Sequence, residues 1–246
     1  MLNAIEQGHN VLAYSGELSN ERFQEWILLQ AAGSDWISLK YDQVKSKNIP
    51  TVIQPARERI LQWLKGRFYL FSSNEDPASS IADSILEVFT MAARRRGCKL
   101  FLVDNIMTAL LDATEEENRA QGRFLGSLKR FAVKYGVHVL VVAHPRKTKA
   151  GEVISKNDVG GNKMITNLAS NVIVVERPDL RVIKARDCGY TRLIECCYAG
   201  DSRRVYQASV GDMNKFSWNK EGLTPPSVRA DSVPEYGVQF SQQQPF

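Results

Sequence analysis

The sequence has few of the residues that build metal centres and disulfide networks. It contains four cysteines and three histidines in 246 residues, and no two cysteines have the C-x-x-C spacing of a metal or redox site. Cys196 and Cys197 are adjacent, so on a strand they would face opposite sides. We expect them, together with Cys98 and Cys188, to be reduced packing residues in a cytosolic protein.

Long apolar runs are missing as well. None approaches the roughly 20 residues of a membrane span, and the first residues lack the basic and apolar regions of a signal peptide. The hydrophobic content of 43% still suffices for a sizeable core, in one large domain or two small ones. The net charge of +5 points weakly to a polyanionic partner.

Short apolar strands alternate with longer helices along most of the chain. This alternation predicts an α/β fold with a mainly parallel sheet, flanking helices and an antiparallel edge. Residues 34–55 give no clear pattern, and 222–246 are rich in Pro, Ser and Gln, which predicts a disordered tail. We expect strands at 11–14, 67–71, 99–103, 137–143, 172–175, 181–184, 193–198 and 203–207, and helices up to 7 and at 19–32, 56–65, 77–96 and 118–135.

Three of the predicted buried strands are followed by a polar residue of a catalytic type: Glu17, Asp104 and His144. Because parallel strands share a carboxyl edge, where ligands bind in such sheets, we expect all three on one rim. Asp104 could hold Mg²⁺, Glu17 could orient or deprotonate a water, and His144 could hydrogen-bond a terminal phosphate. The alternatives are an Asp that caps a helix, a Glu that begins one and a polar residue at a strand end.

A pair of cations, Lys184 and Arg186, ends a late strand. Side chains at positions i and i+2 of a strand point the same way, so the two could reach one target together. Oligomeric phosphoryl-transfer enzymes use such cations on a neighbour's γ-phosphate. A solvated strand face is the alternative interpretation.

The segment 144–163 is strongly basic. Five cations against Glu152 and Asp158 give it a charge of about +3, which suits contact with a nucleic-acid backbone. It has no aromatic residues, so base stacking is not expected; a solvated loop is the alternative. The predicted DNA contacts are Arg146, Lys147, Lys149, Lys156 and Lys163.

The order of these motifs resembles the RecA-like motor domain of ring-shaped replicative DNA helicases, the group of DnaB, phage primase-helicases and Twinkle. The resemblance covers about residues 1–210, and it predicts a motor domain over 1–221. It is carried by five segments: VLAYSGEL at 11–18, LFLVDNIM at 100–107, VLVVAHPRK at 139–147, the stretch from GGNK to TNLASN at 160–171, and KAR at 184–186.

The resemblance implies a role for each matching residue. Glu17 matches the catalytic glutamate, Asp104 the Mg²⁺-associated acid, His144 the γ-phosphate sensor and Arg186 the arginine finger, with Lys184 beside it. It also implies that Asn167, where many members have Gln, borders the nucleotide and DNA sites. It further implies ATP or another NTP, Mg²⁺, single-stranded DNA, a homo-hexameric ring, primase or other replication proteins as partners, and a cytoplasmic or nucleoid-associated location in a bacterial or phage-infected cell.

One motif of that family is missing. The sequence contains no G-x-x-x-x-G-K followed by Ser or Thr, the P-loop whose backbone N–H groups and Lys hold the phosphates. We expect the chain to be part of a longer helicase, incomplete at its N-terminus, and to hydrolyse ATP poorly or not at all by itself. The alternative is an inactive RecA-like module that binds DNA or a helicase ring and donates Arg186 in trans.

Overall fold

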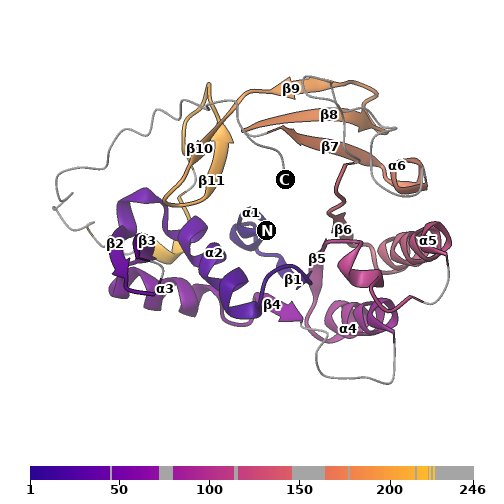
Figure 1. Ribbon diagram of the computed structural model, residues 1–246, viewed down its shortest axis with the longest axis horizontal. Coiled ribbons are helices and arrows are strands. Elements are labelled where there is room, and N and C mark those ends of the chain that lie inside the picture. Colours follow the sequence, from indigo (N-terminus) through magenta and orange to yellow (C-terminus); the bar gives the residue numbers. More distant parts are fainter. Residues whose placement is uncertain are drawn as a thin grey trace.

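The computed structural model describes residues 1–44, 46–71, 80–113, 116–145, 164–176, 178–213 and 215–220, together with 222 and 224. A four-stranded parallel sheet in the order β4-β1-β5-β6 forms its centre (Figure 1). Its strands are β1 (Asn10–Ser15), β4 (Phe68–Phe71), β5 (Cys98–Asp104) and β6 (His138–Val141). The predicted α/β fold with a mainly parallel sheet is confirmed.

Helices cover both faces of this sheet because its central strands are apolar on both sides. Val11 and Ala13 of β1 pack against α1 (Leu2–Glu6), α2 (Asn20–Ala32) and α3 (Gln54–Leu64), and we call this the first core. Leu12 and Tyr14 pack against α4 (Ile81–Arg95) and α5 (Glu117–Tyr135) on the other side, in the second core. Figure 1 shows α2 and α3 on one side of the sheet and α4 and α5 on the other.

The helix boundaries follow local sequence signals. Ser19 and Ser80 cap α2 and α4, since their side chains accept hydrogen bonds from the backbone N–H groups of Arg22 and Asp83. Gly136 ends α5 in a left-handed conformation with φ 58°, which a glycine adopts without strain.

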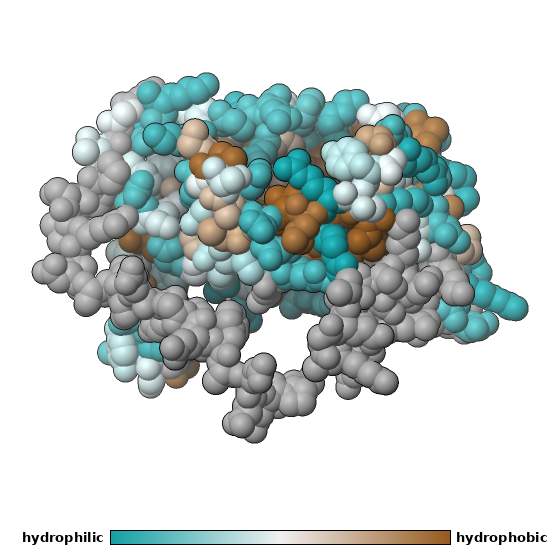
Figure 2. Space-filling view, turned by 90° about the horizontal axis from the view of Figure 1, so that it is seen from above, coloured by the Kyte–Doolittle hydropathy of each residue, from teal (hydrophilic) through white to brown (hydrophobic). Residues whose placement is uncertain are grey.

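Antiparallel strands form three smaller sheets. The expected pairing late in the chain is present as β7 (Asn171–Glu176), β8 (Asp179–Ala185) and β9 (Arg192–Ile194), and as the hairpin of β10 (Cys196–Ala199) and β11 (Arg204–Gln207). The β7–β9 sheet lies at the top of Figure 1, and the face seen from above in Figure 2 carries a few apolar groups among hydrophilic ones.

The hairpin of β2 (Ile37–Asp42) and β3 (Lys47–Val52) was not predicted. Most residues of β2 are exposed and β3 contains Pro50, so neither strand has the buried apolar run that predicts a central strand. Three short 3-10 helices, η1 (Ser34–Trp36), η2 (Thr108–Leu110) and η3 (Ser217–Asn219), and helix α6 (Met164–Leu168) complete the described elements. Among the described residues, none of the helices is both long and apolar enough to cross a membrane.

All four cysteines are unpaired thiols. Cys98 and Cys196 are buried, and burial raises the pKa of the Cys98 thiol to about 11. Cys188 is exposed, so the expectation that it is a packing residue is wrong: it lies in the turn after β8, where nothing covers it within the described chain. The predicted tail at 222–246 falls almost entirely outside the described residues.

Candidate active site at the carboxyl rim of the parallel sheet

The turn after β1 is fastened to the end of β5. The Ser15 hydroxyl donates a hydrogen bond to Asp104 Oδ2 at 3.0 Å, and the Gly16 N–H donates to the Asp104 carbonyl at 2.8 Å. The Leu18 N–H donates in turn to the Ser15 oxygen at 3.3 Å. Because the backbone is held on both sides of Glu17, this carboxylate is directed over the rim next to Asp104.

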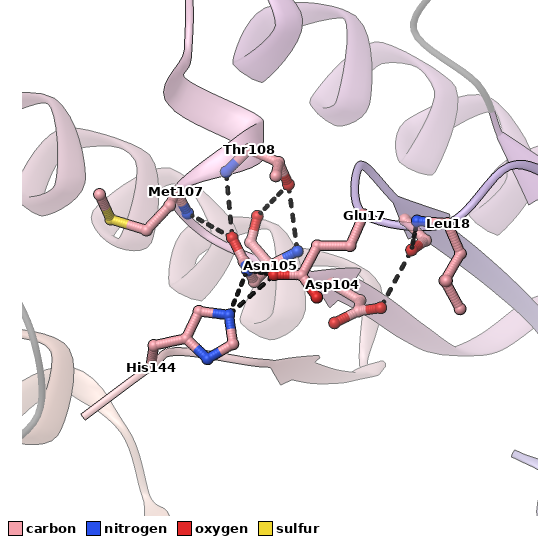
Figure 3. A network of polar contacts seen from close by, with 8 residues as sticks. Glu17, Leu18, Asp104, Asn105, Met107, Thr108 and His144 are labelled. Atoms are coloured by element: carbon pink, nitrogen blue, oxygen red, sulfur yellow. Dashed lines mark hydrogen bonds and ion pairs between the residues drawn. The ribbon is translucent and has the colours of Figure 1, made fainter. Parts of the chain in front are cut away.

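The structure brings the predicted Glu17 and His144 into direct contact. Glu17 Oε1 lies 2.7 Å from His144 Nε2, although the two residues are 127 positions apart in the chain. Glu17 extends from the turn after β1 and His144 lies just beyond β6, so the shared rim of parallel strands places them together (Figure 3). Their side chains are 41% and 59% exposed, which leaves the pair open to a ligand from solvent.

A residue that the sequence interpretation missed, Asn105, joins this pair. It is 1% exposed, and its Oδ1 accepts hydrogen bonds from the Met107 N–H at 2.9 Å and the Thr108 N–H at 3.0 Å. These two bonds fix the orientation of the amide, so Nδ2 points at the rim (Figure 3). There Nδ2 donates a short hydrogen bond to Glu17 Oε1 and lies 2.9 Å from His144 Nε2.

The proton on His144 decides which hydrogen bonds form in this triangle. Asn105 Nδ2 is always a donor, and the ionised Glu17 carboxylate is always an acceptor. When Nε2 of His144 carries no proton, it can accept from Asn105; when it carries one, it can donate to Glu17 instead. The three side chains therefore form a unit in which His144 alone changes its role.

Asp104 lies beside this unit and is half-buried. Burial is the main cause that raises the pKa of its carboxyl, and the charge of Glu17 raises this pKa further. The Ser15 hydrogen bond and His144 act in the opposite direction. A divalent cation at this carboxylate would favour its ionised form.

The donor set suits Mg²⁺ that is shared with a phosphate. No cluster of three or more His, Cys, Asp or Glu side chains able to hold a metal lies in the described part of the chain. Mg²⁺ commonly uses one or two carboxylates and takes its remaining ligands from water and substrate phosphates. Asp104 is the carboxylate that fits this pattern, and nucleotide phosphates would supply the other oxygens.

Close packing at Gly16 gives a test of how tightly the rim is built. A methyl group on Gly16 would lie 2.4 Å from Thr108 Cβ and 2.8 Å from the Tyr14 hydroxyl, closer than atoms can approach. We expect Gly16→Ala to destabilise the protein by about 1–3 kcal/mol in urea unfolding.

Gly126 in α5 provides the matched control. A methyl group there would meet only the end of Arg130 at 3.5 Å, so Gly126→Ala should stabilise the protein by about 0.5–1 kcal/mol. Equal effects of the two variants would show that the rim is not packed as described.

The predicted cations form a second cluster, apart from the first. Lys184 Nζ donates to the backbone carbonyls of Thr166 at 2.6 Å and Ala169 at 2.7 Å, near the end of α6. The carbonyl of Asn167 accepts from both Lys184 Nζ at 3.2 Å and the Arg186 guanidinium at 3.3 Å. The two cations thus point the same way, but no described contact joins them to Glu17, Asp104 or His144.

The five predicted DNA contacts cannot be placed. Arg146, Lys147, Lys149, Lys156 and Lys163 all lie outside the described residues. Their role stays a prediction from the sequence.

Comparison with known proteins agrees with the fold. The chain is 29% identical over 149 residues to the DNA helicase/primase of Enterobacteria phage T3, covering 55% of this chain and 24% of that protein. It is 28% identical over 120 residues to the Twinkle homolog protein, chloroplastic/mitochondrial, of Arabidopsis thaliana, covering 47% of this chain and 17% of that protein. The chain thus spans a quarter or less of the relatives it matches.

Two solved structures share the architecture. One, an isolated ATPase domain, superposes with a TM-score of 0.62 at 12% identity, covering 83% of this chain and 76% of that one. A DnaB-like replicative helicase, described with its interactions with primase, superposes with a TM-score of 0.65 at 11% identity, covering 83% and 53%. At such identities these superpositions show the fold alone.

The predicted resemblance to the group of DnaB, phage primase-helicases and Twinkle is confirmed by these comparisons. The model of the AAA domain family matches residues 3–150, more than half of the chain, and this range contains Glu17, Asp104, Asn105 and His144. The chain belongs to the AAA domain family.

Proposed function

We propose that this chain is part of the motor of a replicative DNA helicase, in which ATP hydrolysis drives movement along single-stranded DNA. The observation that carries the proposal is the Glu17–Asn105–His144 unit next to Asp104, on the rim where parallel sheets bind ligands. The similarity to a phage DNA helicase/primase and to a Twinkle homolog supports the helicase assignment.

Each rim residue has a distinct task in this proposal. Glu17 orients the attacking water and takes its proton, because its free carboxylate oxygens face solvent. Asp104 would hold Mg²⁺, which would neutralise charge on the phosphates. His144 donates a hydrogen bond to the terminal phosphate, and to do so it must leave its contact with Glu17.

The Asn105 amide keeps Glu17 in place while His144 changes partner. Its orientation is fixed by Met107 and Thr108 rather than by His144, so it continues to hold Glu17 Oε1 after the histidine moves. Arrival of the phosphate would thus free Glu17 from His144 without releasing it from the rim.

Lys184 and Arg186 would complete the site of a neighbouring subunit in a hexameric ring. Their common direction supports this role. Within the described residues the Arg186 guanidinium is held by one carbonyl, at 3.3 Å, whereas Lys184 is held by three. Arg186 therefore needs to give up less than Lys184 to reach a phosphate.

Salt titration tests the predicted DNA contacts. If the cations of 144–163 contact about four phosphates of a single strand, the logarithm of the association constant should fall against the logarithm of the salt concentration with a slope of about −3. Fluorescence anisotropy with a labelled oligonucleotide measures this slope. A flat response would exclude the segment from DNA binding.

Restoring the P-loop tests the proposed function as a whole. The sequence has no such motif, so the chain by itself should not turn over ATP. We expect turnover stimulated by single-stranded DNA once the P-loop-bearing segment of a phage primase-helicase relative is joined in frame before Met1. A joined chain that binds ATP with Mg²⁺ but shows no such turnover would contradict the proposal.

A further inference from the structure

The outer edge of β6 is open in the described structure. Within the described residues β6 pairs with β5 alone, and it is the last strand of the sheet on that side. The Val142 N–H and carbonyl, directly after β6, both bond to the β5 side, with Val103 and Ile106. In a parallel ladder alternate residues face alternate neighbours, so the backbone groups of Val139 and Val141 point away from β5.

One face of β6 is also uncovered. Leu140 pairs with Leu102, which packs on the first core, and Leu140 and Val142 on this face are 39% and 37% exposed. Val139 and Val141 point the other way and pack into the second core. The layer of α1, α2 and α3 therefore ends before it reaches β6, and an apolar strip remains beside the open edge.

The handedness of the connections indicates what fits this place. From β4 to β5 and from β5 to β6 the chain moves across the sheet in one direction, through α4 and α5 on the second core. From β1 to β4 it moves in the opposite direction, through α2 and α3 on the first core. Both are the same hand, as expected when parallel crossovers are right-handed.

Helix α1 extends this rule to a strand that would lead into it. Leu2 and Ile5 bury α1 in the first core, before β1. A parallel strand feeding α1 must therefore lie on the β5 and β6 side of β1 (Figure 1). Since β5 and β6 fill the inner places, the position outside β6 is the one that remains.

We propose that the outer edge of β6 is a docking site for an apolar, parallel β-strand that runs into a P-loop and a helix, supplied by another polypeptide segment. The strand would pair with the outward backbone groups of Val139 and Val141, and its helix would cover Leu140 and Val142. Its carboxyl end would reach the rim next to His144, where the P-loop would face Asp104. The role of that loop rests on the proposed function, whereas the docking itself does not.

Amide hydrogen exchange tests the docking directly. The probe is the strand–P-loop–helix segment of a phage primase-helicase relative, added as a separate polypeptide to the isotope-labelled full chain. The Val139 and Val141 amides should exchange at least about tenfold more slowly with saturating probe, because they gain hydrogen bonds. The Leu140 amide, already bonded to β5, should change little. Unchanged exchange at Val139 and Val141 would overturn the proposal.

Substitutions locate the docking site. Val141→Pro removes an outward N–H that β5 does not use, and it should weaken binding of the probe at least about tenfold. Leu140→Lys charges the apolar strip and should weaken binding similarly, even if the proline variant does not fold. Leu193→Lys on β9, which changes an equally apolar residue that is 53% exposed, is the matched control. Equal weakening by both lysine variants would overturn the assignment to β6.

These measurements are independent of catalysis. Slower exchange at Val139 and Val141 without any ATP turnover by the mixture would support the docking site and would count against the proposed motor function. ATP turnover with unchanged exchange would have the opposite meaning.

Discussion

Replacement of Glu17 by Gln should lower the ATP turnover of the motor with a restored P-loop by about 10²- to 10⁴-fold, the usual contribution of a general base. Glutamine has the same shape and keeps an oxygen that can accept from Asn105 Nδ2, so the rim should stay folded. It cannot take a proton from water, however. The loss should therefore appear in kcat, with the affinity for ATP changed much less.

An exposed carboxylate gives the matched control. Glu87 lies on α4, points to solvent and is outside the rim, so Glu87→Gln should leave turnover unchanged. If Glu17→Gln keeps more than about a tenth of the turnover, Glu17 is not the base, and its contact with His144 would need another explanation.

The position of Glu17 on the rim followed from the sequence because the relevant rule is local. Apolar runs at 11–14, 99–103 and 137–143 predicted three buried strands, and the structure has β1, β5 and β6 at these places. Parallel pairing then brings their carboxyl ends to one edge, whatever the details of packing. The rule gives the rim and the residues on it, but not the contacts that they make with one another.

Asn105 shows where this reasoning stops. Its partners Glu17 and His144 are 88 and 39 positions away, and its own burial depends on how η2 folds back over β5. In the sequence it is one polar residue after an acid, as in many loops that leave a strand. The signal that could have identified it is the pattern of Asn followed by a turn, since such side chains often accept from N–H groups two and three residues later.

Asn105→Ala should destabilise the protein by about 2–4 kcal/mol in urea unfolding. The substitution leaves the Met107 and Thr108 N–H groups without their acceptor, in a place where Asn105 itself is 1% exposed. It also removes the donor that holds Glu17. Asn48→Ala in β3 is the control, because Asn48 is exposed and its loss should change stability by less than about 0.5 kcal/mol.

Asn105→Asp separates the two tasks of this side chain. An aspartate keeps the oxygen that accepts from Met107 and Thr108, but it places a second oxygen where Nδ2 now meets Glu17. Two carboxylates in contact bind a proton more readily in the folded state than in the unfolded chain. By linkage, the stability of this variant relative to the wild type should therefore fall as the pH rises from about 5 to about 8.

The comparison of the two variants decides what Asn105 does. If Asn105→Asp matches the wild type near pH 5 and loses stability near pH 8, the turn survives and the donor to Glu17 is what the substitution removes. If it is as stable as the wild type at the higher pH, Nδ2 does not hold Glu17, and Asn105 shapes the rim only through its turn. In that second case Glu17 depends on His144 alone, and a phosphate that attracts His144 would release the base as well as free it.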